Sequence, residues 1–122
     1  MNGTILSDVK NYIGLNPEEI DPDYDKPIMD AINVAIGELA KIGLGHLGDF
    51  MVQSGQETWD AYLGEEYQYV RAFAVDYVEL TAKLKFDTPQ NGALKSALDE
   101  QLRKASDNVQ TAIEYHNLMK EG

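Results

Sequence analysis

Apolar residues recur at helical spacing in several segments of the chain, which predicts an all-α fold. In the first segment the pattern ends at Gly14, a residue type that often terminates helices. Residues 15–26 then lose the period and contain two prolines and five acidic residues, so we expect an acidic loop there. The predicted first helix is short, and its apolar stripe consists of Ile5, Val9, Tyr12 and Ile13.

A second helix is predicted over residues 27–42. Pro27 has a fixed φ that suits the first position of a helix, and the apolar pattern continues until Gly43. Glycines are too frequent between Gly43 and Gly55 for a helix, so we expect an irregular, partly buried loop in which residues 50–52 can be extended. The stripe of the second helix consists of Ile28, Ile32, Ala35, Ile36, Leu39 and Ile42.

A third main helix is predicted over residues 65–86. Before it, Thr58 is expected to cap a short helical turn that ends at Gly64. Apolar residues cover more than one face of the third helix, which indicates contacts on more than one side. Its core stripe contains Tyr67, Val70, Ala74, Tyr77, Val78, Thr81 and Leu84, and a second strip contains Tyr69, Phe73 and Leu80.

The closing helix is predicted over residues 93–120, with no internal glycine or proline. About 28 residues at 1.5 Å each would reach roughly 40 Å, which exceeds the diameter of a compact domain of this size. We therefore expect part of this helix to project from the domain or to meet a neighbour. The complete pattern predicts one domain over residues 1–122: a small all-α bundle of about four helices, with a long C-terminal helix and an irregular loop between the second and third helices.

Aromatic residues are concentrated between residues 59 and 77. Most of them are expected in the core, because aromatic side chains supply much of its buried area. One helix cannot easily bury Tyr67, Tyr69, Phe73 and Tyr77 together, since they spread around its circumference. Some should therefore face a partner. The predicted interface residues are Trp59, Tyr62, Tyr69 and Phe73.

The net charge of −11 argues against tight binding to phosphate backbones. Residues 1–60 hold 11 acidic and 3 basic residues, so most of the excess lies in the first half. Two interpretations remain open: a surface that keeps the protein soluble, and a repulsive lining for a DNA passage. Because the chain has no cysteine, no signal-peptide pattern and no run long enough to cross a bilayer, we expect a protein without disulfides that stays in the compartment where it is made.

Two glycine and aspartate patterns suggest sites, but their context opposes both. Gly43, Gly45 and Gly48 match GxGxxG, yet they follow a helix where a dinucleotide site needs a preceding strand. The acids at positions 21, 23 and 25 imitate the start of a calcium loop, but Lys26 occupies the obligatory glycine position. Neither pattern supports a cofactor or a metal.

Catalytic motifs are equally lacking in the sequence. His46 and His116 have no acid at ligand spacing, and we expect both to be structural or exposed. No nucleophile elbow, phosphate loop or His-Glu-x-x-His pattern occurs. The sequence therefore predicts a protein that is not an enzyme and has no cofactor.

The order of these segments resembles a known family. SDVKNYI at residues 7–13, the acidic loop, and IMDAINVA at residues 28–35 resemble the N-terminal half of phage head-tail connector proteins. A helix ending in LKFDTP at residues 84–89, followed by a long closing helix, is similar to their C-terminal part. The resemblance covers nearly the whole chain and is weakest over residues 43–58.

The resemblance implies a virion protein that is assembled in the bacterial cytoplasm. Its copies would form a ring, dodecameric in the family, that docks under the portal protein, extends the DNA channel and offers a platform to tail-joining proteins. DNA would pass through without being tightly bound, no membrane would be involved, and no catalytic residue is implied. On this view we expect Asp21, Asp23 and Asp25 to line the channel. Two alternatives remain open, a small helical adaptor from a cellular pathway and, more remotely, a metal-dependent helical enzyme.

Overall fold

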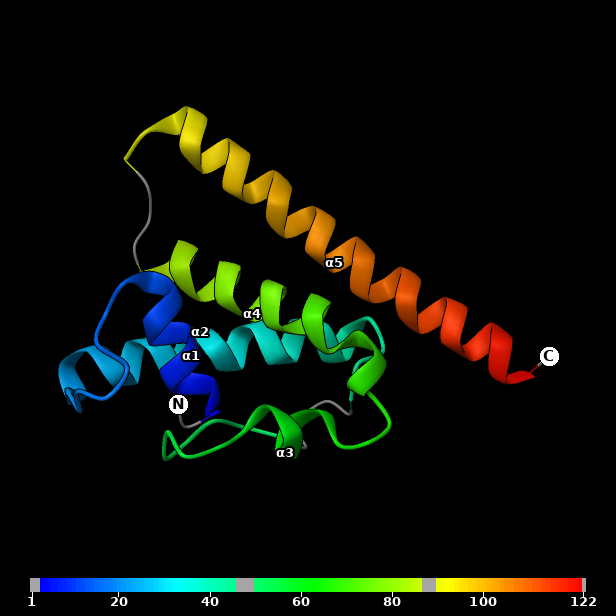
Figure 1. The fold of residues 1–122 in the computed structure, drawn as a ribbon. Helices are drawn as coiled ribbons and strands as arrows, with labels where there is room; N and C mark the ends of the chain where they lie inside the picture. The colour runs from blue at the N-terminus through cyan, green and yellow to red at the C-terminus, as the bar shows by residue number, and fades with distance from the viewer. Residues whose placement is uncertain (1–2, 46–49, 87–89, 122) are drawn as a thin grey trace.

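The computed structural model describes residues 3–45, 50–86 and 90–121 (Figure 1). Within these ranges the β pairing is limited to an isolated antiparallel bridge between Thr4 and Thr58. The prediction of an all-α fold with a long closing helix is confirmed. The helices are α1 (Ile5–Ile13), α2 (Pro22–Lys41), α3 (Trp59–Leu63), the 3-10 helix η1 (Gln68–Val70), α4 (Arg71–Phe86) and α5 (Gly92–Glu121).

Helix α1 has the boundaries that its sequence predicts. The Thr4 side chain accepts a hydrogen bond from the Ser7 backbone N–H at 3.2 Å and so caps the first turn. Gly14 ends the helix at φ 106°, in the left-handed region that glycine adopts without steric cost. The Ile5 N–H donates to the Glu57 carbonyl at 2.9 Å, which ties the start of α1 to the segment before α3.

Helix α2 begins at Pro22, earlier than the predicted residue 27. Asp21 is the cap, and its carboxylate accepts a backbone N–H of the first turn. Pro27 therefore lies inside the helix, where it cannot donate a backbone hydrogen bond. An ion pair at 2.8 Å between Asp25 and Lys10 holds this first turn against α1 and offsets the missing bond.

The third predicted helix is also shorter than expected, because residues 64–67 form turns and η1 precedes α4. Gly64 has a φ of 62°, which interrupts the helical path. Gln68 donates to the Gly64 carbonyl at 2.8 Å, and Arg71 pairs with Asp60 at 2.6 Å. These contacts fix the turn that joins α3 to α4.

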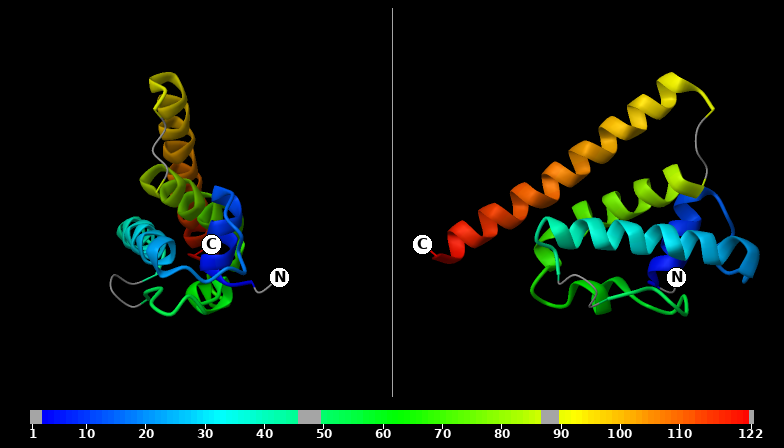
Figure 2. Two further views of the ribbon diagram at one scale, coloured as in Figure 1. Left: turned by 90° about the vertical axis from the view of Figure 1, so that its left-hand side faces the viewer. Right: turned by 180° about the vertical axis from the view of Figure 1, so that it is seen from behind.

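The helices form a body of α1, α2 and α4, with α3 on one side and α5 lying across α4 on the other (Figures 1 and 2). Thr58 caps α3 as predicted, by accepting from the Ala61 N–H at 3.0 Å. The largest fully buried side chains, which mark the core, are Trp59, Ile5, Ile28, Ile32, Leu39, Leu44, Leu63, Val9, Val70, Val78 and Val109.

The predicted irregular loop is confirmed over residues 43–45 and 50–58, where the structure has turns and bends. Val52 is buried, and its backbone exchanges two hydrogen bonds with the Asn33 side chain, at 2.7 and 2.9 Å. The loop is thus held against α2 without forming a strand. His46 and Gly48, which belong to predictions above, lie outside the described residues.

Helix α5 buries side chains against the body mainly through its middle, and Leu98 and His116 make further contacts on either side. Ala105, Val109 and Ile113 are buried against it, whereas the C-terminal turns extend past the other helices (Figures 1 and 2). The prediction that part of this helix projects is confirmed. No helix among the described residues is long and apolar enough to cross a membrane.

Candidate assembly surfaces

Trp59 belongs to the core of the subunit rather than to an interface. Its side chain is 2% exposed, and its indole N–H donates to the Asp8 carboxylate at 2.7 Å. Asp8 lies on α1, far away in sequence, and gives the polar edge of the indole the partner it needs when buried. The expectation that Trp59 faces a partner is therefore wrong for this fold.

Tyr69 and Phe73 lie on the surface, as predicted for interface residues. They are 39% and 37% exposed, while Tyr77 on the same segment is buried. The Tyr69 ring stacks on His116 of α5 at 3.9 Å with 12° between the planes. Burial and the neighbouring Tyr67 raise the pKa of the Tyr69 hydroxyl. Tyr69 thus holds α5 to the body and still presents an exposed edge.

Tyr62 lies in a groove of about 220 Å³ that is open to the surface. Its ring packs against Phe50 with the centroids 5.1 Å apart. Burial, reinforced by Tyr67, raises the pKa of the Tyr62 hydroxyl, which has no hydrogen-bond partner among the described residues. Glu66 is the one charged side chain among the described residues that line the groove. We call this feature the aromatic groove, and its lining includes Ile36, Ala40, Leu44, Ala61, Tyr62, Glu66 and Tyr67.

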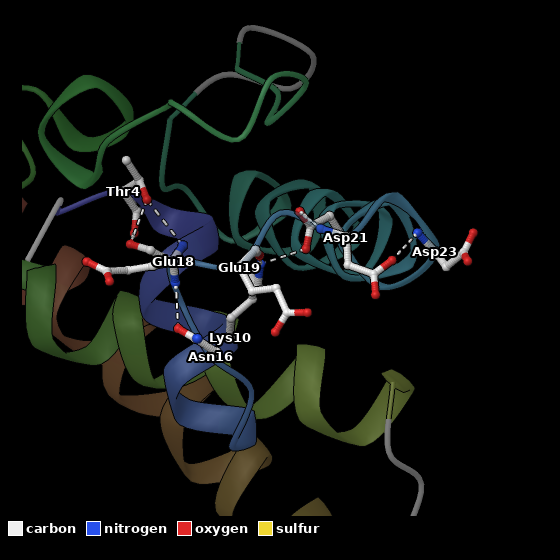
Figure 3. A network of polar contacts seen from close by, with 9 residues as sticks. Thr4, Lys10, Asn16, Glu18, Glu19, Asp21 and Asp23 are labelled. Carbon is white, nitrogen blue, oxygen red and sulfur yellow. Dashed lines mark hydrogen bonds and ion pairs between the residues drawn. The ribbon is translucent and has the colours of Figure 1, made fainter.

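The three aspartates expected to line a channel have different environments, and Figure 3 shows two of them, Asp21 and Asp23. Asp25 is buried, with one carboxylate oxygen 2.8 Å from Lys10 Nζ and the other accepting from the Asp21 N–H at 3.3 Å. Lys10 also donates to the Glu19 carbonyl. Asp25 therefore cannot line a channel, which corrects that part of the prediction. Asp21 caps α2 and is partly exposed, and Asp23 is exposed.

The same contacts fix the shape of the acidic loop. The Glu18 N–H donates to the Asn16 side chain at 3.0 Å, and Lys10 anchors the loop at Glu19 (Figure 3). Ile20 is left 86% exposed between acidic neighbours. Sequence reasoning missed the role of Lys10, whose one visible signal is a basic residue beside the apolar stripe in an otherwise acidic segment.

Carboxylates also meet at the contact between α1 and α4. Partial burial and the negative charges of Asp8 and Asp76 raise the pKa of Glu79 to about 7. Among the described residues no group of three or more acidic or histidine side chains is arranged to hold a metal ion. The negative charges of Asp8, Asp76 and Glu79 therefore repel one another at the contact between α1 and α4, and we do not interpret them as metal ligands.

The end of α5 carries a second apolar face that sequence reasoning missed. Tyr115, Leu118 and Met119 are 63%, 67% and 61% exposed. Their spacing of three and four residues is itself a helical signal, distinct from the buried face of Ala105, Val109 and Ile113. The structure thus gives α5 an inner face on the body and an outer apolar face at its tip.

A sequence model of the phage connector protein family matches residues 5–116. No curated protein and no solved structure matches the chain significantly. The matched range runs from the first residue of α1 to the residue of α5 that stacks on Tyr69, so it includes the whole helical body. On this match over nearly its full length, the chain belongs to the phage connector protein family.

Proposed function

We propose that the protein is a structural component of a phage virion, the head-tail connector that forms a ring under the portal. The observation that carries this proposal is the family match over residues 5–116. In this role copies of the chain extend the DNA channel of the portal and bind the tail-joining proteins below. The protein performs no catalysis, and its site of action is the assembled particle.

The exposed aromatic surface supports assembly into a ring. A head-to-tail ring needs two different complementary surfaces on each subunit. Tyr69 and Phe73 offer one apolar surface beside α5, and the projecting tip of α5 offers another. Large exposed apolar side chains of this kind are favoured in protein interfaces. The proposed interface residues are therefore Tyr62, Tyr69 and Phe73, without Trp59.

The charge of the chain supports a channel through which DNA slides. A net charge of −11 repels phosphate groups and prevents a tight grip. Asp21 and Asp23 lie at the surface of the acidic half, so they are the residues we place in the channel wall. The proposed ring is dodecameric, as the family resemblance implies.

Electron microscopy of the concentrated protein, alone and mixed with portal protein, tests this function. We expect closed rings, coaxial with the portal in the mixture. The variant Phe73→Ala should keep the helical circular dichroism spectrum and form fewer rings, because Phe73 is exposed and its loss spares the core. Tyr12→Ala, which removes another exposed aromatic residue at 42% exposure, is the matched control and should assemble normally. A protein that forms no ring under either condition would contradict the proposal.

A further inference from the structure

We propose that the last two turns of α5, residues 114–120, form an arm that packs into the aromatic groove of a second copy of the chain. This inference rests on the proposed ring and names the two sides of one contact between neighbouring subunits, in addition to the exposed surface of Tyr69 and Phe73. The two features are the exposed tip of α5 and the groove that contains Tyr62 and Tyr67.

Apart from His116, which stacks on Tyr69, the arm extends away from its own subunit (Figure 1). Val109 and Ile113 are the last buried residues of α5, and every side chain from 114 to 120 is exposed. At about 100° per residue, Leu118 points roughly 180° from Val109, and Tyr115 points roughly 120° from it. Leu118 and Tyr115 therefore face away from the body, and the helix continues beyond the point where the body ends (Figures 1 and 2).

The groove is shaped for an apolar insertion. Aliphatic side chains from the end of α2 and aromatic rings from α3 and the following turn line it. The buried Tyr62 hydroxyl lacks a partner among the described residues, and an incoming side chain with a polar group would supply one. On the arm, Asn117 lies beside Leu118 and carries such a group. The arm thus offers apolar side chains for the apolar lining of the groove and the Asn117 amide as a hydrogen-bond partner for the Tyr62 hydroxyl.

The arm cannot fill the groove of its own subunit. Residues 93–120 contain no glycine or proline, so α5 has no residue at which a sharp kink is expected. In Figures 1 and 2 the arm extends past the helices that form the groove instead of turning toward it. Only the arm of another copy can therefore enter.

Charge also favours a second copy as the occupant. Copies with a net charge of −11 repel one another over most of their surface. The arm, residues 114–120, holds one acidic and one basic residue, Glu114 and Lys120, so its formal net charge is zero. Glu66 is the one charged side chain among the described residues of the groove. The arm is thus neutral in a chain that is otherwise acidic, and its Lys120 can pair with Glu66 of the groove.

The contact joins two different surfaces, so each copy can use its arm on one neighbour and its groove on the other. Such a heterologous contact closes into a ring when the rotation between copies permits it. The arm therefore supplies the direction in which subunits follow one another around the connector.

Cysteine cross-linking tests this contact, because the chain has no cysteine of its own. One chain carries Leu118→Cys on the arm, and a second chain with a different tag carries Ala61→Cys in the groove. Both positions are exposed in the free subunit, so the variants should fold normally. After mixing and mild oxidation at a concentration that gives rings, we expect a disulfide-linked heterodimer as the main product, since a disulfide requires Cα atoms within about 7 Å. A single chain with both changes should give a ladder of multimers.

The matched control replaces Leu118→Cys with Ser96→Cys, an exposed position near the other end of α5, and should cross-link to Ala61→Cys only at background level. Rings in the electron microscope without the Leu118–Ala61 cross-link would overturn the inference and leave the proposed function standing. A doubly substituted chain that links within itself and stays monomeric would also overturn it. The cross-link without closed rings would support the arm contact and contradict the proposed ring. Absence of both would contradict the two together.

Discussion

Lys10 is the residue on which the acidic loop and the first turn of α2 depend. It pairs with Asp25, and both side chains are largely buried. Replacing Lys10→Met leaves the Asp25 carboxylate buried without its counter-charge, so we expect the free energy of unfolding to fall by about 3 kcal/mol. Urea unfolding followed by circular dichroism measures the loss.

The matched control for that change is Lys26→Met, which breaks an ion pair with Asp30 whose two side chains are 75% and 65% exposed. Exposed pairs contribute little, so this variant should lose less than about 1 kcal/mol. Equal losses in the two variants would show that burial does not decide the strength of the Lys10–Asp25 pair.

Individual residue environments were the least predictable level of this structure. Trp59 and Asp25 belong to residue types that are frequent at interfaces and surfaces, and both were predicted there. Their burial depends on Asp8 and Lys10, polar partners on α1 that only the tertiary fold brings close. The pattern of apolar and polar positions within one segment cannot predict these two contacts, because each joins residues of different segments.

At the scale of elements, the spacing of apolar residues predicted the helices well, because each helix buries one face. The ends of α1 and α3 were also predictable, since Thr4 or Thr58 and a following glycine act within a few residues. The start of α2 was not predictable in this way. Pro22 and Pro27 both suit the first position of a helix, and the ion pair with α1 stabilises the helix that begins at Pro22. The aromatic groove was also not predictable, because α2, the loop after it and the segment around α3 form it together, and the pattern of no single segment reveals it.

The contact between α1 and α4 should make stability depend on pH. The pKa of Glu79 is raised from 4.5 to about 7, so the folded state binds a proton that the unfolded state has lost between these values. Stability due to this group therefore falls as pH rises from about 4.5 to 7, and the full destabilisation remains above pH 7. We expect Glu79→Gln to be more stable than the natural chain at pH 8 by about 1 kcal/mol, a value reduced because solvent screens the half-buried side chain.

Unfolding of both proteins at pH 4, 6 and 8 checks this expectation. The other carboxylates titrate alike in the two chains, so the difference between the chains reports on Glu79. The difference should shrink toward zero at pH 4, where the Glu79 carboxyl is neutral in the folded and the unfolded state. A difference that stays constant with pH would indicate a packing effect of the substitution instead.

At the scale of the whole molecule, the net charge of −11 and the projecting α5 (Figure 1) have to be compatible with the same proposed ring. The proposed ring would bring many acidic chains together, so their repulsion would have to be exceeded by local apolar contacts, for which we propose Tyr69, Phe73 and the arm. In the proposed ring, the excess of acidic residues in the first half would form a surface that repels what it faces. In a connector the candidate is DNA, whose passage requires a wall without basic contacts.

This interpretation predicts how charge in the wall affects DNA passage. Asp23→Lys changes the charge of each subunit by two units at an exposed position and leaves the Asp21 cap of α2 in place. Phage particles that carry this variant should eject DNA several-fold more slowly, because each lysine attracts passing phosphates, and added salt should reduce the delay by screening. Asp23→Asn should have a smaller effect, and Asp107→Lys, with the same change of charge at an exposed position of α5 outside the arm, controls for net charge alone. Asp21→Lys is avoided because it also removes the helix cap. If particles with Asp23→Lys assemble normally and eject DNA at the natural rate, Asp23 does not face the channel.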